Sequence, residues 1–256
     1  MTLYPPNRLK RLLAERQTAL GYWLSTNSLA VTEIAAGAGW DWLLLDMEHS
    51  LLDVESVERH LLAAHHAGPE AELVVRIPTI DPVLVKQLLD AGVRSFMFPF
   101  VQTVEEAQLA VASTRYPPAG IRGFSGSTRA TRFGRDTDYL RTYADEICVI
   151  IQIESPAAVA NISGYGQVDG IDAMLVGAND LAANMGHLGD TRHPAVARAV
   201  EDAGRAIVAT GKAAGFQFFD ERAEHLMGQG FTLAAVAGDI NTLTAGMASE
   251  LKRLRG

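Results

Sequence analysis

Short runs of apolar residues alternate along the whole chain with longer stretches in which apolar and polar residues recur at helical spacing. The apolar runs are rich in Val, Leu, Ile and Phe and show little polar alternation, which is typical of strands covered on both faces of a parallel sheet. Eight such strands are predicted, at residues 21–24, 42–46, 73–76, 95–99, 147–153, 173–176, 215–218 and 233–236. Helices are predicted at 28–38, 54–67, 82–91, 104–113, 155–161, 194–209, 221–227 and 241–255.

Local signals mark the ends of several predicted helices. Asp81 precedes Pro82 as an N-cap followed by proline at the first helical position, and Gly92 stands where a glycine would end that helix. Thr103 and Glu106 have the spacing of a capping box. Eight strand–helix units in succession predict a closed (β/α)8 TIM barrel of the α/β class. No Gly-x-Gly-x-x-Gly follows any predicted strand, which argues against a dinucleotide-binding sheet.

The bulk properties fit this prediction. The 256 residues are close to the usual size of one such barrel, so residues 1–256 are expected to form a single domain. Apolar residues make up 48% and charged residues 20%, as in soluble globular proteins. A net charge of −8 without a basic run argues against nucleic-acid binding. A single cysteine, no secretory signal and no apolar run that could span a bilayer predict a cytoplasmic protein.

One connection, residues 116–146 between the fourth and fifth strands, is unusually long. It contains two consecutive prolines, a Gly/Ser-rich segment at 120–128 and arginines at positions 122, 129, 132 and 135. Long ordered loops in compact domains are often lids or binding elements. A surface excursion with solvated arginines is the alternative interpretation.

Polar residues gather where several predicted strands end, and the active sites of such barrels lie at the carboxyl ends of the strands. These residues are Asp46, Glu48 and His49 after the second strand, Arg76 at the third, Gln152 and Glu154 at the fifth, and Asp180 after the sixth. Each also has a structural interpretation, as a helix cap or as one half of an ion pair. Their convergence from different strands onto one rim favours a functional site.

The residue types at this rim point to a metal. Glu154 and Asp180 are carboxylates from neighbouring strands, and Mg²⁺ is usually held by one or two carboxylates with water and substrate completing its shell. No Cys/His cluster has zinc spacing. None of the four lysines, at positions 10, 86, 212 and 252, is predicted at a strand carboxyl end, which disfavours a Schiff base. An enolate would then have to be held by the metal and an arginine.

At these residues the sequence resembles the HpcH/HpaI aldolase family, the metal-dependent class II pyruvate aldolases. The similarity runs from about Gly21 to Thr242, nearly the whole chain. The segments that carry it are GWDWLLLDMEH (39–49), VVRIP (74–78), KQLLD (86–90), TRYPPAGIRG (114–123), QIE (152–154) and DL (180–181). Each fragment alone is weak, but their combination is highly specific.

The resemblance implies an aldehyde-lyase that cleaves or forms 4-hydroxy-2-oxo acids from pyruvate and an aldehyde through a metal-stabilised enolate. Substrates of the family include 4-hydroxy-2-oxo-heptanedioate and 2-keto-3-deoxy-sugar acids, and the cofactor would be Mg²⁺, Mn²⁺ or Co²⁺. It also implies a domain-swapped C-terminal helix and a homo-hexamer, built as a trimer of dimers, with sites near subunit interfaces.

The same resemblance assigns roles to individual residues. Glu154 and Asp180 would be the metal ligands. His49, oriented by Asp90, would be the acid/base acting through a metal-bound water, and Arg76 would neutralise the enolate oxygen. The residues expected to contact substrate are Arg76, Gln152, Ala178, Asp180 and Gln217. Those expected to support the water network are Asp46 and Glu48.

Two segments differ from the family pattern. Where the family usually has Gly-Pro-Ala-Asp-Leu-Ser, residues 177–182 read Gly-Ala-Asn-Asp-Leu-Ala. After the seventh strand the usual Gly-(Phe/Ile)-Leu reads Gly-Phe-Gln at 215–217, and Phe218 and Phe219 follow. Those positions face the aldehyde in relatives, so we expect Gln217, Phe218 and Phe219 to set the choice of aldehyde.

Two other functions are open on the sequence alone. A related lyase acting on another oxo acid or a CoA thioester would share the metal and Arg76 but need a larger cleft, and the basic 116–146 loop is compatible with one. A catalytically silent barrel that binds or assembles other molecules is a third possibility, and the intact Glu154, Asp180, Arg76 and His49 count against it. Pyruvate release with and without EDTA separates the three.

Overall fold

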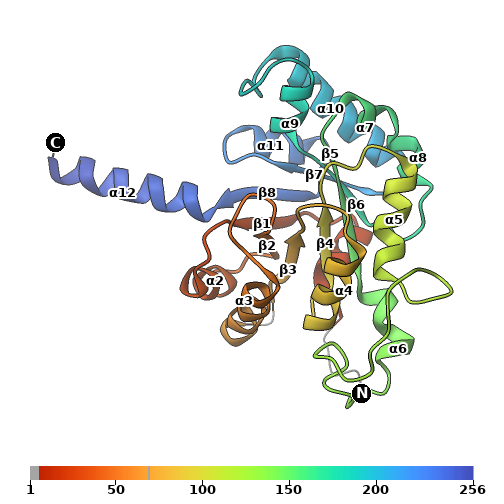
Figure 1. Cartoon of the computed structure of the whole chain (residues 1–256). Coiled ribbons are helices and arrows are strands. Elements are labelled where there is room, and N and C mark those ends of the chain that lie inside the picture. Colours follow the sequence, from red (N-terminus) through yellow and green to blue (C-terminus); the bar gives the residue numbers. More distant parts are fainter. Residues whose placement is uncertain (1–5, 69, 256) are drawn as a thin grey trace.

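Eight parallel strands close into a barrel in which each strand is hydrogen-bonded to the next and β8 returns to β1 (Figure 1). The computed structural model describes residues 6–68 and 70–255. The strands are β1 Ala19–Leu24, β2 Trp42–Asp46, β3 Glu72–Arg76, β4 Ser95–Phe98, β5 Cys148–Ile153, β6 Ala173–Val176, β7 Ala213–Gln217 and β8 Leu233–Gly238. The predicted TIM barrel is confirmed, and its strand boundaries agree with the prediction to within two residues.

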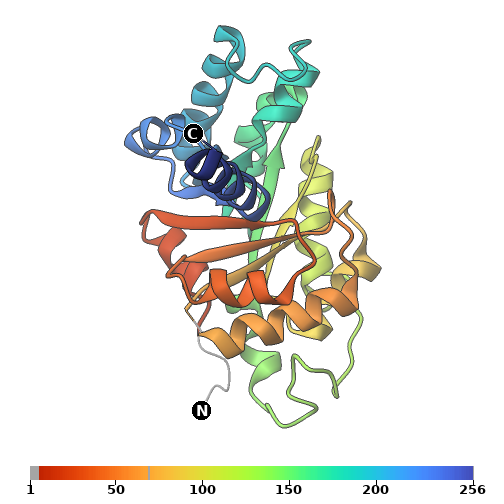
Figure 2. The same ribbon diagram turned by 90° about the vertical axis from the view of Figure 1, so that its left-hand side faces the viewer.

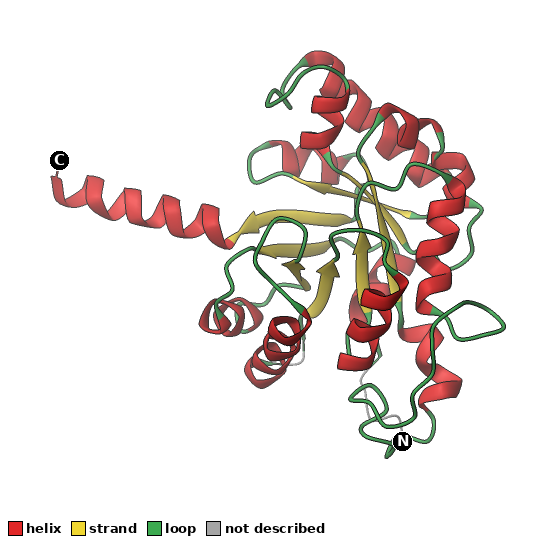
Figure 3. Cartoon of the chain, in the orientation of Figure 1, coloured by secondary structure: helices red, strands yellow, loops and turns green. Residues whose placement is uncertain are grey.

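Helices surround the barrel and cover the outer faces of the strands (Figure 3). They are α1 Arg8–Ala14, α2 Leu29–Ala36, α3 Val54–Ala67, α4 Pro82–Ala91, α5 Val104–Thr114, α6 Tyr139–Thr142, η1 Tyr143–Glu146, α7 Pro156–Ala160, α8 Ile162–Gly166, α9 Ala178–Asn184, α10 Pro194–Ala209, α11 Arg222–Gly228 and α12 Asp239–Arg255. The short helices α1, α6, η1, α8 and α9 were not predicted. Of these, α9 matters most because it carries Asp180.

The predicted helix ends are confirmed by their hydrogen bonds. The Asp81 carboxylate accepts from the backbone N–H groups of Val83 and Leu84 at the start of α4. Gly92 ends that helix with a φ of 107°, a left-handed conformation that glycine adopts without strain. Thr103 and Glu106 form the reciprocal capping box at the start of α5.

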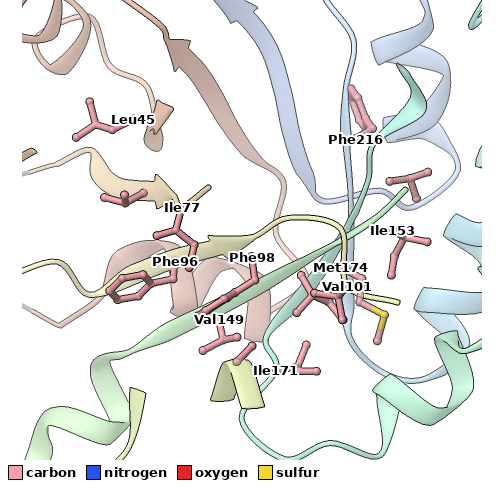
Figure 4. Close-up of a cluster of buried hydrophobic side chains, with 14 of the residues drawn as sticks. Leu45, Ile77, Phe96, Phe98, Val101, Val149, Ile153, Ile171, Met174 and Phe216 are labelled. Carbon is pink, nitrogen blue, oxygen red and sulfur yellow. The ribbon is translucent and has the colours of Figure 1, made fainter. Parts of the chain in front are cut away.

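The pleat of the strands divides the apolar side chains into two cores. Outward-facing residues pack between barrel and helices, among them Phe96, Phe98, Val149 and Phe216 (Figure 4). Inward-facing residues fill the barrel itself. On β5, for example, Cys148 and Ile150 face inward, while Val149, Ile151 and Ile153 join the outer core. Because side chains alternate along a strand, the next inward residue is Gln152, at the carboxyl end.

The 116–146 loop packs at the amino end of the barrel, against the last turns of α3 and α4. Arg122 is fully buried, donates to the Asp90 carboxylate at 2.8 Å, and lies over the ring of Tyr116 at 4.4 Å. Arg129 pairs with Glu58 of α3 at 2.7 Å. The interpretation of this loop as an excursion with solvated arginines is therefore wrong for Arg122, whose charge is held inside the fold.

The last helix, α12, projects away from the barrel and points toward the viewer in Figure 2. Residues 240–255 are all exposed. The apolar side chains along it, at helical spacing, are Ile240, Leu243, Met247, Leu251 and Leu254. Within the described residues, no helix combines the length and the apolar character that crossing a membrane requires.

Candidate active site

A cavity of about 280 Å³ opens at the carboxyl ends of the strands, where the sequence predicted the site. The residues expected there that line it are Asp46, His49, Arg76, Gln152, Glu154, Asp180 and Gln217. Asp46, Arg76, Gln152 and Gln217 are the last inward-facing residues of β2, β3, β5 and β7. The alternation that fills the barrel with apolar side chains lower down thus places a ring of polar groups at its top.

Arg76 is locked in place by two carboxylates. Its Nε and Nη2 donate to the two Asp46 oxygens at 3.0 and 2.6 Å, a bidentate arrangement, and its Nη1 lies 2.8 Å from Glu48 Oε2. Its guanidinium carbon also lies 4.7 Å from the Trp23 ring centroid. A planar guanidinium held in this way cannot reorient, so its remaining Nη hydrogens have a fixed direction.

Asp46 is the residue on which this arrangement depends. Besides Arg76, it accepts hydrogen bonds from Trp23 Nε1 at 3.1 Å and from the backbone N–H of His49 at 3.2 Å. Burial alone would raise the pKa of Asp46, but the hydrogen bonds and charge of Arg76, with the Trp23 indole, lower it below its ordinary value. Asp46 is therefore held ionised, and it positions both Arg76 and the segment that carries His49.

The pKa of Glu48 is shifted in the opposite direction to that of Asp46. Burial raises the pKa of its carboxyl, and the charge of Arg76 offsets this only in part. Glu48 Oε2 lies 3.9 Å from His49 Nε2, whose side chain is 66% exposed at the rim of the cavity. His49 is thus accessible to solvent and to a substrate that enters from the carboxyl end.

Glu154 is fixed by three features of the fold. Its Oε2 accepts from the backbone N–H of Phe100 at 2.8 Å, and its Oε1 accepts from Gln152 Nε2 at 3.0 Å. A Cβ on Gly177 would lie 2.4 Å from Oε1, so only glycine leaves room for the carboxylate. Burial raises the pKa of Glu154 to about 7. The Phe100 N–H lowers it, and the charges of Asp180 and Glu48 raise it further.

These residues fit a divalent cation. Both groups that donate to Glu154 are uncharged, and the charges of Asp180 and Glu48 add to the rise in its pKa that burial causes. Gln152 Oε1 is buried, and no group in the described part of the chain donates a hydrogen bond to it. Residues 6–68 and 70–255 contain no cluster of three or more His, Cys, Asp or Glu that could hold a metal. The donor set is therefore two carboxylates at most, as Mg²⁺ sites commonly are.

Three expected residues are placed elsewhere by the fold. Asp90 lies at the last turn of α4, at the amino end of the barrel, so within one chain it is not brought to His49. The Ala178 methyl packs in the outer core, while its neighbours Gly177 and Asn179 line the cavity. Phe218 also lies in the outer core, with the Arg222 guanidinium 3.9 Å from its ring centroid.

Phe219, in contrast, lines the cavity beside Gln217, as expected. The four lysines, all inside the described ranges, are absent from the cavity wall. Lys10 Nζ is engaged at the amino end, 3.1 Å from the Asp172 carboxylate.

Several residues that line the cavity were not identified on the sequence alone, among them Trp23 and Asp239. Trp23 is the last inward-facing side chain of β1, and Asp239 follows β8 at the start of α12. Asp239 is buried and accepts from the backbone N–H groups of Ser25 and Thr26, which fixes the loop after β1. The signal was present: the strand-end rule, applied to the first and last strands, finds both.

A closed barrel with carboxylates, an arginine and a histidine around a cavity at the carboxyl ends of its strands has the arrangement of a TIM-barrel enzyme. The sequence pattern of the HpcH/HpaI aldolase/citrate lyase family matches residues 19–245, and the chain belongs to this family. It is accordingly a class II aldolase, an aldehyde-lyase.

Individual relatives support this assignment along nearly the whole chain. The chain is 42% identical over 236 residues to the 5-keto-4-deoxy-D-glucarate aldolase of Escherichia coli O9:H4 (strain HS), covering 92% of this chain and 91% of the relative. It resembles the crystal structure of an HpcH/HpaI aldolase/citrate lyase family protein from Burkholderia cenocepacia J2315, with a TM-score of 0.94, 39% identity and coverage of 98% and 100%. The HpcH/HpaI aldolase of Desulfitobacterium hafniense DCB-2 follows with a TM-score of 0.88, 30% identity and coverage of 96% for both chains.

Proposed function

We propose that this enzyme cleaves, and in reverse forms, 4-hydroxy-2-oxo acids, with pyruvate and an aldehyde as the two halves. The observation that carries the proposal is that Glu154, Asp180 and a fixed Arg76 line one cavity. A 2-oxo acid presents adjacent carboxylate and keto oxygens, and such a site supplies a cation on one side of them and a guanidinium on the other.

The substrate class extends to sugar-derived dicarboxylic acids such as the 5-keto-4-deoxy-D-glucarate named for the Escherichia coli relative. Read from its keto end, that compound is a 4-hydroxy-2-oxo acid whose aldehyde product carries a hydroxyl and a carboxylate. Gln217 lines the cavity after β7 and can both donate and accept hydrogen bonds. An amide there suits an aldehyde with polar substituents better than an alkyl one.

Glu154 and Asp180 would hold the divalent cation, Mg²⁺, Mn²⁺ or Co²⁺, with Gln152 Oε1 facing the same space. When bound, the cation would supply Lewis-acid polarisation of the 2-oxo acid. Asn179, beside Asp180, also lines the cavity. The side chain of Ala178, between Gly177 and Asn179, packs in the outer core instead.

The side chains of the chain itself account for substrate orientation and proton transfer. Asp46 and Glu48 fix Arg76, and its Nη groups still have hydrogens to donate to the oxygen on which enolate charge develops. His49 would take the proton of the C4 hydroxyl, the C3–C4 bond would break, and its electrons would pass to the pyruvate half. A proton returned to C3 completes pyruvate. General acid–base assistance of this kind contributes roughly 10²–10⁴-fold.

A role for Asp90 in orienting His49 requires a second copy of the chain, because the two residues lie at opposite ends of one barrel. We infer that the protein is a homo-oligomer, with the hexamer and swapped C-terminal helix of the family as its expected form. The support is α12, whose apolar side chains are exposed along its length. We also propose that residues 1–256 form a single domain and that the protein is cytoplasmic.

The test is a retro-aldol screen over a panel of 4-hydroxy-2-oxo acids, read by coupled pyruvate detection with and without EDTA. We expect pyruvate release that EDTA abolishes and added Mn²⁺ or Mg²⁺ restores, with 5-keto-4-deoxy-D-glucarate among the better substrates. Turnover of a CoA thioester, with none of the hydroxy-oxo acids cleaved, would instead support the related-lyase alternative.

A further inference from the structure

Phe100, just after β4, has a backbone conformation that a phenylalanine rarely adopts. Its φ is +49°, in the left-handed region, where a side chain with a Cβ costs about 1–2 kcal/mol. The other non-glycine residues with positive φ in the described part of the chain are Arg16, Arg132 and Phe133, which lie in turns at or near the amino end. Phe100 alone among these contacts the site, since its N–H donates to Glu154 Oε2 at 2.8 Å.

Packing of the phenyl ring does not explain the strain. The Phe100 side chain is 51% exposed, so the conformation gains little apolar burial. What the left-handed turn does achieve is to let the chain donate this N–H to Glu154 and still bring Gln102 to its own partners after β5. Because φ is a rotation about the N–Cα bond, a β-region φ at this position would turn the N–H relative to residues 101–102. The bond to Glu154 and the contacts of Gln102 could then not both form, and losing the first would leave a buried oxygen of Glu154 without its donor.

The turn is also held from its far side. The Asn161 side chain donates to the backbone carbonyl of Gln102 at 2.9 Å, and the Ser155 hydroxyl donates to the Gln102 side chain. Ser155 directly follows Glu154 and Asn161 follows α7, so the segments after β4 and β5 are joined by several hydrogen bonds. A strained residue persists where its surroundings over-determine it in this way, commonly at functional sites.

We propose that Phe100 is a positioning residue for cation binding: its left-handed backbone fixes the plane of the Glu154 carboxylate. The donors from Phe100 and Gln152 reach one carboxylate oxygen each, and the missing Cβ of Gly177 leaves space for the group. With its rotation stopped, the carboxylate meets an incoming cation without reorganising. This inference rests on the proposed metal-dependent function.

The test replaces Phe100 with residues that differ in how readily they adopt the left-handed conformation, and it measures the Mn²⁺ affinity of each variant by calorimetry. Glycine and asparagine adopt this φ readily, alanine less so, and β-branched valine worst. We expect Phe100→Gly and Phe100→Asn to bind Mn²⁺ within about threefold of wild type. Phe100→Val should bind about 10- to 100-fold more weakly, as for loss of a group that orients a metal ligand, with Phe100→Ala between them.

Arg16 offers a matched control, since its φ is +56° and it lies in the exposed turn before β1, at the other end of the barrel. Arg16→Val should lower the Tm as Phe100→Val does but leave the Mn²⁺ dissociation constant unchanged. If Phe100→Val does not fold, the Gly, Asn and Ala series still orders the affinities.

Equal Mn²⁺ affinity across the whole series would overturn the positioning role. Failure of the wild-type protein to bind Mn²⁺ at all would instead overturn the proposed function, so the two failures are distinguishable. An affinity that tracks the Tm in both the Phe100 and the Arg16 variants would also count against the inference, because it would reveal a general stability effect.

Discussion

The two ends of the barrel each hold a cavity beside a buried glutamate, and they treat its charge in opposite ways. At the amino end Glu72 lies 2.6 Å from Arg94 Nη2 and accepts from the Ser95 hydroxyl at 3.0 Å. At the carboxyl end Glu154 accepts from two uncharged N–H groups and faces Asp180. Burial raises the pKa of both carboxyls. For Glu72 the charge of Arg94 is the largest opposing effect, whereas for Glu154 it is the hydrogen bond of an uncharged backbone N–H, and the charges of Asp180 and Glu48 add to the rise.

The larger of the two cavities is not the candidate active site. The amino-end cavity is about 420 Å³, larger than the 280 Å³ of the site, and it is lined by leucines, Phe133 and four arginines. Among those arginines, Arg94 and Arg129 form ion pairs with acids of β3 and α3. What distinguishes the active end is a buried carboxylate, Glu154, whose hydrogen-bond donors are uncharged and which shares its cavity with Asp180, as expected where a cation binds.

The sharpest test of this comparison replaces each glutamate by glutamine. Glu154→Gln should lower kcat/KM by about three orders of magnitude, since Lewis-acid stabilisation is worth several kcal/mol, and leave the metal-free protein at least as stable. Glu72→Gln should cost about 2–3 kcal/mol of stability by removing the charge that faces Arg94, with kcat/KM unchanged. Pyruvate-release kinetics and thermal melts of both variants read this out. Loss of activity in folded Glu72→Gln would contradict the assignment of Glu72 to stability and of Glu154 to catalysis.

The arginines of the two ends form a second matched pair. Arg76→Ala should lower kcat/KM by about two to three orders of magnitude, by analogy with the loss of one oxyanion donor. It should also lower stability, because Asp46 would be left buried without its partner. Arg76→Lys should recover part of both losses, since an ammonium keeps the charge without the fork. Arg94→Ala should lose stability alone, and near-wild-type turnover by Arg76→Ala would refute the assignment.

The stability of the metal-free protein should depend on pH through Glu154. Its pKa is raised to about 7 in the fold, above the ordinary value of 4.5, so the stability contributed by its protonated form is present below pH 4.5. As pH rises from 4.5 to 7 this contribution is lost, by roughly 3 kcal/mol in total. The Tm values of EDTA-treated wild type and Glu154→Gln should diverge over this range, because only the wild type loses stability as Glu154 ionises. Parallel curves would show that Glu154 titrates normally.

Added Mn²⁺ should reverse the decline, because a cation binds the ionised carboxylate and displaces its proton. The apparent affinity for Mn²⁺ should therefore rise with pH up to about 7 and level off above it. The same titration of Glu72→Gln should follow the wild type.

The smallest expected effect concerns the aldehyde. Gln217→Leu should shift preference from hydroxylated or carboxylated aldehydes toward alkyl ones by roughly five- to a hundredfold, because an unpaired polar partner costs about 1–3 kcal/mol. Pyruvate C3 proton exchange without aldehyde should barely change. Phe218→Leu is the control: Phe218 packs in the outer core, so it should lower the Tm and leave preference alone. Equal slowing of exchange and cleavage in Gln217→Leu would place Gln217 in the pyruvate half.

The barrel was predictable because its strands are continuous runs of Val, Leu, Ile and Phe, a pattern that depends on burial of both faces. The rule that such sites form at strand carboxyl ends then located Arg76, Gln152 and Glu154 in the cavity, and the family resemblance added Gln217. The same rule reaches Trp23 and Asp239, which were overlooked. Alternation also separates Phe218 from Gln217, since adjacent residues of a strand point to opposite faces.

Other features depend on contacts that no local pattern encodes. The burial of Arg122 requires Tyr116, Tyr139 and Tyr143, which surround its guanidinium only once the 116–146 loop has folded back on α4. The left-handed turn at Phe100 contacts Glu154, which lies 54 residues further along the chain. The position of Asp90 was assigned by resemblance, and its distance from His49 within one chain follows only from the direction of α4.

The most direct test of the central claim is a cation add-back titration of the demetallated enzyme, measured as pyruvate release from a 4-hydroxy-2-oxo acid. We expect no turnover before addition, recovery that saturates at one Mn²⁺ per chain, and no recovery in the Glu154→Gln, Asp180→Asn double variant. Full turnover without a cation, or a borohydride-trapped pyruvate adduct on a lysine, would contradict the assignment of the chemistry to this pair of carboxylates.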